Sequence, residues 1–245
     1  MPVFKVRPRA DSYGHDIGIL LIEARTPFIP GDVGNASTYR YPVLYRMVMD
    51  VTIERLIEDG DLSLTGRVIE AAKALEDAGV RAITSDCGYM LHFQEQVAAT
   101  VSVPVMLSSL LQLPFIDALL GRSQAIGIVC ANRRRLTPDL LAKAHPYPRR
   151  PVHIAGLEDK PNFRAPVLDE TDTLDSDKIE AEVVETALAL VGAHQEIGAI
   201  LLECSNLPPY AAAVARATGR PVFDFVTMID HVRAASRRQP FVGHY

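Results

Sequence analysis

The segment Ala82-Ile-Thr-Ser-Asp-Cys-Gly-Tyr89 has a counterpart later in the chain, Ala199-Ile-Leu-Leu-Glu-Cys-Ser-Asn206. Each copy is a short, mostly apolar run of strand length that ends in an acidic residue and a cysteine. In both copies a Pro-Val pair follows 17 positions after the cysteine and opens another apolar run. The chain therefore carries an internal repeat, which predicts two similar structural units.

Strand-like and helix-like segments alternate along the whole chain, which is typical of parallel sheets with crossover helices. We expect strands over 17–22, 47–52, 80–85, 104–107, 125–130, 152–155, 198–203 and 221–225. We expect helices over 62–78, 90–101, 109–120, 133–144, 176–194, 208–218 and 227–237, with 157–174 irregular. The prediction is an α/β protein of two similar lobes, the first formed by 1–122 plus 223–245 and the second by 123–222.

The composition limits the classes of protein to which the chain belongs. Its 245 residues are 48% hydrophobic and 22% charged, which is ordinary for a globular protein. The net charge of −5 gives no reason to expect nucleic acid as a partner, and no apolar run approaches the length of a membrane span. The N-terminal sequence lacks the apolar core of a signal peptide, and three widely spaced cysteines do not form a disulfide framework. We therefore expect a cytoplasmic protein with free thiols.

The sequence also lacks the common cofactor motifs. It contains no Gly-x-Gly-x-x-Gly and no Walker loop, and its seven histidines show neither His-Glu-x-x-His nor zinc-ligand spacing. We therefore expect no cofactor and no metal site.

The two repeated cysteines, Cys87 and Cys204, are each predicted to lie where a strand ends and a helix begins. In an open α/β sheet that edge binds ligands, and a helix N-terminus favours an anion and lowers the pKa of a thiol. A single cysteine in an apolar stretch is more often a small buried hydrophobe. Its recurrence at matching strand ends favours a chemical role for both residues. Cys130, at the end of another predicted strand, is left open between pocket wall and core.

Other polar segments follow predicted strands and are candidate pocket walls. The turn-rich loop Pro30–Asn35 follows the first strand, and Ser108-Ser109 follows the strand over 104–107. Arg133–Arg135 opens a predicted helix, where a solvated face is the plainer interpretation, although one arginine there could face a substrate carboxylate. Asp86 and Glu203, next to the cysteines, either point away from them or turn toward a neighbouring His or Arg.

The residues resemble those of the aspartate/glutamate racemase superfamily. The segments Thr84–Tyr89 and Leu202–Asn206 are similar to its two cysteine motifs. The strand 125–130 with the following Asn132, and the stretch Ser108–Leu111, are also similar, so the resemblance covers most of the chain.

The resemblance implies two α/β lobes related by pseudo-twofold symmetry, with the active site between them. It implies that Cys87 and Cys204 act as acid and base without a cofactor. Because the two repeats place equivalent strand ends across one cleft, we expect the two sulfurs to face each other about 7–8 Å apart around a substrate carbon. The residues then expected to hold the substrate are Gly88, Tyr89, Ser205, Asn206, Ser109, Asn132 and Asn35. Gly88 is expected to let the backbone approach the ligand closely.

The chain departs from the racemase pattern after each cysteine. Glutamate and aspartate racemases typically have Asn-Thr after the first cysteine, where this chain has Gly88-Tyr89, and Thr after the second, where it has Ser205. We therefore expect poor turnover of glutamate and aspartate, and a small carboxylate or cyclic amide with a less polar substituent as substrate.

The primary hypothesis is a cofactor-independent racemase or epimerase that uses two thiols. The alternatives are a cysteine-dependent isomerase or decarboxylase of the same superfamily, and a non-catalytic protein that binds a small ligand between two lobes. The sequence leaves the oligomeric state open, a homo-oligomer included.

Overall fold

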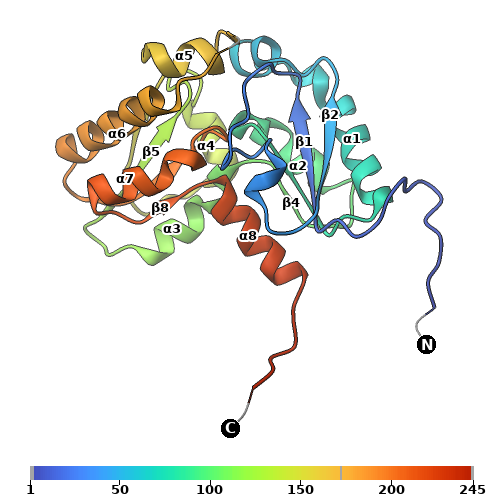
Figure 1. Cartoon of the computed structure of the whole chain (residues 1–245). Helices are drawn as coiled ribbons and strands as arrows, with labels where there is room; N and C mark the ends of the chain where they lie inside the picture. The colour runs from blue at the N-terminus through green and yellow to red at the C-terminus, as the bar shows by residue number, and fades with distance from the viewer. Residues whose placement is uncertain (1–2, 172, 244–245) are drawn as a thin grey trace.

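The computed structural model describes residues 3–171 and 173–243, and they form two four-stranded parallel sheets (Figure 1). The first sheet has the order β2-β1-β3-β4, and the second has the equivalent order β6-β5-β7-β8. All strand pairings in both sheets are parallel. The predicted α/β fold with two similar lobes is therefore confirmed. The strands are β1 (Ile17–Ile22), β2 (Val43–Val48), β3 (Ala82–Ser85), β4 (Val105–Met106), β5 (Ala125–Cys130), β6 (Val152–Gly156), β7 (Ile197–Leu202) and β8 (Val222–Phe223).

Helices flank the sheets, and several strand-to-helix connections begin with a tighter 3₁₀ turn. The α-helices are α1 (Thr65–Ala78), α2 (Gln94–Ala98), α3 (Leu113–Leu119), α4 (Pro138–Ala144), α5 (Pro161–Val167), α6 (Ser176–Ala193), α7 (Ala211–Thr218) and α8 (Phe225–Ser236). The 3₁₀ segments are Ala36–Thr38, Leu62–Leu64, Gly88–Phe93, Ser109–Gln112 and Pro208–Tyr210, and Glu54–Glu58 forms one turn of π-helix. None of the helices among residues 3–171 and 173–243 is long and apolar enough to cross a membrane.

Four predicted elements differ from those observed. The second strand covers 43–48 rather than 47–52, because the chain turns at Asp50, whose φ is 63°. The helix predicted over 133–144 begins only at Pro138, where the Thr137 hydroxyl accepts a hydrogen bond from the N–H of Leu140. The region 157–174, expected to be irregular, contains α5 despite a proline inside it. The helix expected over 90–101 is mostly 3₁₀, with only 94–98 in α form.

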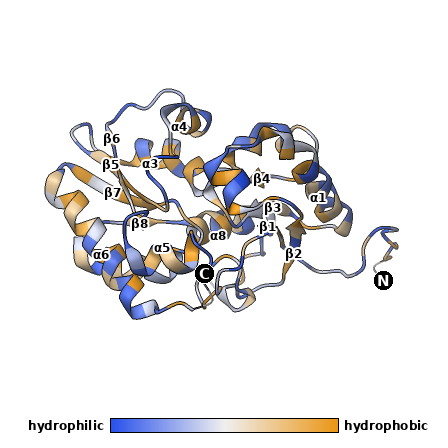
Figure 2. Ribbon diagram, turned by 90° about the horizontal axis from the view of Figure 1, so that it is seen from above, coloured by the Kyte–Doolittle hydropathy of each residue, from blue (hydrophilic) through white to orange (hydrophobic). Residues whose placement is uncertain are grey.

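Burial explains why the central strands lie where they do. Every residue of β5 and β7 is buried, as expected for parallel strands covered by helices on both faces. Helix α6 buries residues spaced three and four apart, such as Ile179, Val183 and Leu190, and shows both apolar and polar colours in Figure 2.

One continuous cluster of buried apolar side chains joins the two lobes. It extends from Leu20 and Ile83 in the first sheet to Ile126 and Leu201 in the second. The lobes therefore share an apolar interface, and their relative position is fixed by packing.

The last helix returns to the first lobe after the second sheet ends. Phe225 and Ile229 of α8 pack in one buried cluster with Ile17 and Ile19 of β1. The buried carboxylate of Asp16, just before β1, accepts hydrogen bonds from Arg233 (3.0 Å) and from Arg237. Helix α8 thus completes the core of the first lobe (Figure 1).

Truncating the anchor of α8 should destabilise the protein strongly. We expect Phe225→Ala to lower the free energy of unfolding by about 3–5 kcal/mol, because it leaves a cavity under a fully buried ring. Phe241→Ala, at a position 94% exposed, should change it by less than about 0.5 kcal/mol. Urea unfolding followed by circular dichroism measures both, and equal effects would contradict the assigned role of α8.

Candidate active site

The two repeated cysteines lie at equivalent points of the two sheets. Cys87 follows β3 and Cys204 follows β7, each the third strand in its sheet order. Both side chains line one narrow pocket between the lobes, with a cavity volume of about 30 Å³. Both residues are 7% exposed. The sequence prediction that both cysteines belong to one site therefore agrees with their placement.

The polar lining of this pocket is acidic. Asp86 and Glu203 both line it, and among the described residues that line it there is no lysine, arginine or histidine. The carboxyl of Asp86 accepts a hydrogen bond from the N–H of Ile22 (2.9 Å), and one oxygen of Glu203 accepts one from Ala131 (3.4 Å). Neither side chain turns to a histidine or arginine. The pocket therefore favours a positively charged group over a free anion.

Burial shifts the acidity of both carboxyls. Desolvation raises the pKa of Asp86 to about 8 and that of Glu203 to about 7. The Oε1 atom of Glu203 is buried without a hydrogen-bond partner among the described residues. A buried polar atom of this kind is rare and marks a place where a ligand group can be bound.

Gly88 packs closely against Glu203 of the other lobe. A Cβ atom at position 88 would lie 1.8 Å from Oε1 and 2.9 Å from the carbonyl oxygen of Glu203, so the Glu203 side chain would have to move. We expected Gly88 to allow the backbone to approach a substrate closely. Gly88 lines the pocket, and the space that a side chain would occupy there is taken by Glu203.

The thiols are less acidic than the sequence predicted. Burial, and then the nearby Glu203 carboxyl, raise the pKa of Cys87 and of Cys204 well above the usual value. Hydrogen bonds from the backbone N–H groups of Tyr89 and Met90 act in the opposite direction on Cys87. The expectation that a helix N-terminus would lower the pKa was wrong, because desolvation outweighs those hydrogen bonds. With their pKa values raised in this way, both thiols are protonated at neutral pH.

A series of hydrogen-bonded side chains connects Cys204 to the first lobe. Its thiol donates to Oδ1 of Asn206 (3.4 Å), and Nδ2 of Asn206 donates to Oδ2 of Asp32 (2.7 Å). Asp32 is buried, which raises its pKa to about 7. Sequence reasoning identified the loop around Asp32 as a pocket wall but selected Asn35, because an aspartate in a loop rich in proline and glycine is also ordinary turn chemistry.

Two of the predicted binding residues form hydrogen bonds between the lobes. The hydroxyl of Tyr89 donates to the carbonyl of Asn132 (2.7 Å) and accepts from its N–H (3.2 Å). The hydroxyl of Ser205 donates to the carbonyl of Asp86. Both residues line the pocket, but their polar groups are already engaged across the junction.

Three predicted binding residues lie outside the pocket lining. The hydroxyl of Ser109 donates to the carbonyls of Leu202 (3.2 Å) and Glu203 (3.0 Å). The Asn132 side chain donates to Glu58 (3.2 Å), and that of Asn35 donates to the carbonyl of Phe28 (2.8 Å). Each therefore supports a pocket wall from behind.

The remaining candidates also lie away from the pocket lining. Cys130 is fully buried in the shared core, and its thiol is within 3.6 Å of the carbonyl of Ala155. The side chain of Arg134 pairs with Asp159, and that of Arg135 pairs with Glu58.

Sequence reasoning missed the apolar wall of the pocket. It is formed by side chains from several segments, namely Ile22, Ala24, Phe28, Ile53, Ile57 and Val167. Ile57 lies in the π-helical turn and Val167 in α5, neither of which the sequence pattern predicted. The pocket thus combines carboxyls and thiols on one side with an apolar surface suited to methyl or methylene groups.

Comparison with known proteins agrees with the fold and with the cysteine motifs. The family model for Asp/Glu/hydantoin racemase matches residues 45–235. The allantoin racemase from Pseudomonas fluorescens superposes with a TM-score of 0.63 at 18% identity, covering 89% of each chain. At that identity the superposition shows a shared fold.

Two curated relatives carry a different activity in their names. Dimethylsulfoniopropionate lyase from Durusdinium sp. clade D is 34% identical over 221 residues, which cover 87% of this chain and 72% of the relative. Dimethylsulfoniopropionate lyase 6 from Emiliania huxleyi is 35% identical over 238 residues, covering 93% of this chain and 61% of the relative. The chain therefore spans less than two thirds of the latter protein.

The buried Glu203 should make stability depend on pH. Its pKa is near 4.5 in the unfolded chain and about 7 in the fold, so its contribution is complete below about pH 4.5 and is lost as pH rises to 7. In the wild type this loss lowers the free energy of unfolding by about 3 kcal/mol, and we expect Glu203→Gln to abolish it. The variant should therefore become more stable than the wild type as pH rises from about 5 to 8. Urea unfolding across that range measures the difference. The exposed control Glu95→Gln should follow the wild type, and a Glu203→Gln profile parallel to the wild type would refute the assignment.

Proposed function

The chain belongs to the Asp/Glu/hydantoin racemase family, and we propose that it is a cysteine-dependent lyase that cleaves dimethylsulfoniopropionate into dimethyl sulfide and acrylate. Membership of an enzyme family and the lyase names of its relatives support an enzymatic role. The observation that carries the proposal is the pocket lining, which has two buried carboxyls and, among the described residues, no basic side chain.

A sulfonium substrate fits this electrostatic pattern better than glutamate or aspartate. Dimethylsulfoniopropionate has a permanently positive sulfur at one end and a carboxylate at the other. The unpartnered Oε1 of Glu203 provides a site for the positive sulfur, and its binding favours the ionised carboxylate. The apolar wall that includes Phe28 and Ile57 accommodates the two methyl groups.

The substrate's charge also explains how a thiol with a raised pKa becomes a base. A positive charge in a buried pocket favours thiolate, so the thiol ionises when the sulfonium is bound. A thiolate with a high conjugate pKa is a stronger base than an ordinary one. The substrate therefore promotes the ionisation that its own cleavage requires.

The reaction is a β-elimination without an oxidant or reductant. The thiolate takes the proton from the carbon next to the carboxylate, and that C–H electron pair forms the C=C bond. The bond between the β-carbon and sulfur breaks, and its electron pair neutralises the sulfonium. Dimethyl sulfide and acrylate leave, and the proton taken from the substrate restores the starting thiol. The one proton that the reaction releases is the proton that the thiol gives to solvent when it ionises.

We assign the base to Cys204. Its thiol is oriented by a hydrogen bond to Asn206, and Asn206 is oriented in turn by Asp32. Reactive side chains in active sites are commonly positioned by such a series of three residues. Among the described residues, Cys87 has no equivalent series of hydrogen-bonded side chains. Elimination needs one base, so Cys87 serves to position the substrate on the opposite wall.

Racemisation is the second candidate, and the paired cysteines favour it. Two thiols at equivalent strand ends line one pocket, as proton transfer on both faces of a carbon requires. That reaction also needs groups that stabilise the charge on the substrate carboxylate. The acidic lining argues against it for glutamate and aspartate.

Product analysis distinguishes the two reactions. We expect dimethylsulfoniopropionate to yield equal amounts of dimethyl sulfide and acrylate, measured by headspace gas chromatography and by chromatography of the solution. The trimethylammonium analogue should compete with the substrate because it keeps the charge, whereas neutral 3-(methylthio)propionate should not compete. Racemisation of glutamate or aspartate without any release of dimethyl sulfide would overturn the lyase proposal.

Cysteine variants should have unequal effects on the lyase reaction. We expect Cys204→Ser to lower kcat/KM by about 10²–10⁴-fold, the usual contribution of a general base. Cys87→Ser should lower it by only about tenfold, and Cys130→Ser should leave turnover largely intact because Cys130 lies outside the pocket lining. Loss of activity to the same extent in Cys87→Ser and Cys204→Ser would instead indicate a reaction that needs both thiols.

A further inference from the structure

A cluster of potential metal ligands lies at the end of the second sheet opposite the pocket. His194 follows the last residue of α6, and Glu196 immediately precedes β7. His153 is the second residue of β6, an edge strand. The six residues of β7 separate this end from Cys204 by about 20 Å, so the cluster is independent of the proposed reaction.

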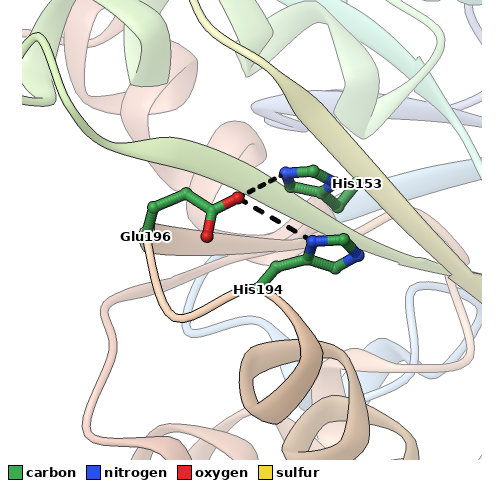
Figure 3. A group of neighbouring side chains, drawn as sticks. All are labelled: His153, His194 and Glu196. Atoms are coloured by element: carbon green, nitrogen blue, oxygen red, sulfur yellow. Dashed lines mark hydrogen bonds and ion pairs between the residues drawn. The ribbon is translucent and has the colours of Figure 1, made fainter.

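The three side chains converge on one point. Oε1 of Glu196 lies 2.9 Å from Nε2 of His153 and 3.8 Å from Nδ1 of His194. The two imidazole rings are stacked, with centroids 3.6 Å apart and planes 13° from parallel. Figure 3 shows the carboxylate facing a nitrogen of each ring. All three potential ligand atoms lie within 4.8 Å of one another.

The local fold holds this arrangement in place. The N–H of Ile197 donates to the carbonyl of His194 (3.0 Å), which closes the turn and brings His194 close to Glu196. In the adjacent strand β5, the residue in register with His153 is Gly127. A Cβ atom at Gly127 would lie 3.2 Å from the side chain of Ile197, so β5 packs closely against the residue that follows Glu196.

We propose that His153, His194 and Glu196 bind one first-row transition-metal ion of the Zn²⁺ class. Two imidazole nitrogens and a carboxylate oxygen are typical donors for such ions, rather than for Ca²⁺ or Mg²⁺. The separations of 2.9 and 3.8 Å lie on either side of the roughly 3.3 Å between ligands in a tetrahedral site with Zn–N bonds of 2.0–2.1 Å. Glu196 is exposed, so its side chain moves back to admit the ion, and water takes the fourth position.

The bound ion would connect the edge strand β6 to the turn between α6 and β7, on the two sides of β5. Its effect is therefore on the stability of the second lobe and not on the chemistry of the pocket. The site was not predictable from the sequence, because His153 lies about 40 positions from His194 and Glu196 and the three do not have zinc-ligand spacing.

Zinc binding to the untagged full chain tests the proposal. Calorimetry should show one saturable site in the wild type and also in Cys87→Ser/Cys204→Ser, which removes the pocket thiols as competing ligands. His153→Ala, His194→Ala and Glu196→Gln should each weaken binding by at least about tenfold. The control His231→Ala, which removes an exposed histidine outside the cluster, should bind as the wild type does.

Thermal unfolding supplies an independent readout. At about 100 times the dissociation constant, Zn²⁺ should raise the unfolding temperature by about 5 °C or more in the wild type and not in His153→Ala/His194→Ala. Circular dichroism checks that each variant is folded. Absence of saturable binding, binding that persists in the double histidine variant, or binding that disappears with the pocket thiols would each overturn the proposal.

Discussion

The junction between the lobes depends on the burial of one carboxyl group. Glu203 belongs to the second lobe, yet its Oε1 atom occupies the space beside Gly88 of the first. Burying a carboxyl is unfavourable unless it is neutral or paired, and here burial raises its pKa to about 7. The carboxyl packs directly against Gly88, and it adds to the burial that raises the pKa of both cysteines. The chemistry of the pocket follows from that single placement.

Hydrogen bonds across the junction surround this carboxyl and limit motion of the pocket. Tyr89 binds the backbone of Asn132, Ser205 binds the carbonyl of Asp86, and Asn206 binds Asp32. Polar side chains that sequence reasoning assigned to substrate recognition are thus used to hold the walls. A small pocket with fixed walls discriminates by charge and shape. This is why a substrate with a sulfonium group, rather than glutamate or aspartate, agrees best with the site.

The sequence predicted the elements that depend on local pattern and repetition. The matching runs before Cys87 and Cys204 are strands, and because parallel strands end at one edge, both cysteines line one pocket. Contacts between distant segments were not predictable, because no local pattern encodes them. Asp32 and Asn206 are 174 positions apart, and only the folded lobes bring them together. Likewise Val167 lines the pocket from a helix whose internal proline made the segment look irregular.

The position of α8 has a consequence for the order in which the protein folds during synthesis. The ribosome completes β1 early, but the side chains that cover Ile17 and Ile19 are Phe225 and Ile229. Until α8 emerges, one face of the first sheet lacks the apolar side chains of that helix. The second sheet, in contrast, is complete once β8 has been made. A nascent chain of this topology exposes its N-terminal lobe longest, so that lobe is the part most exposed to chaperones and to aggregation.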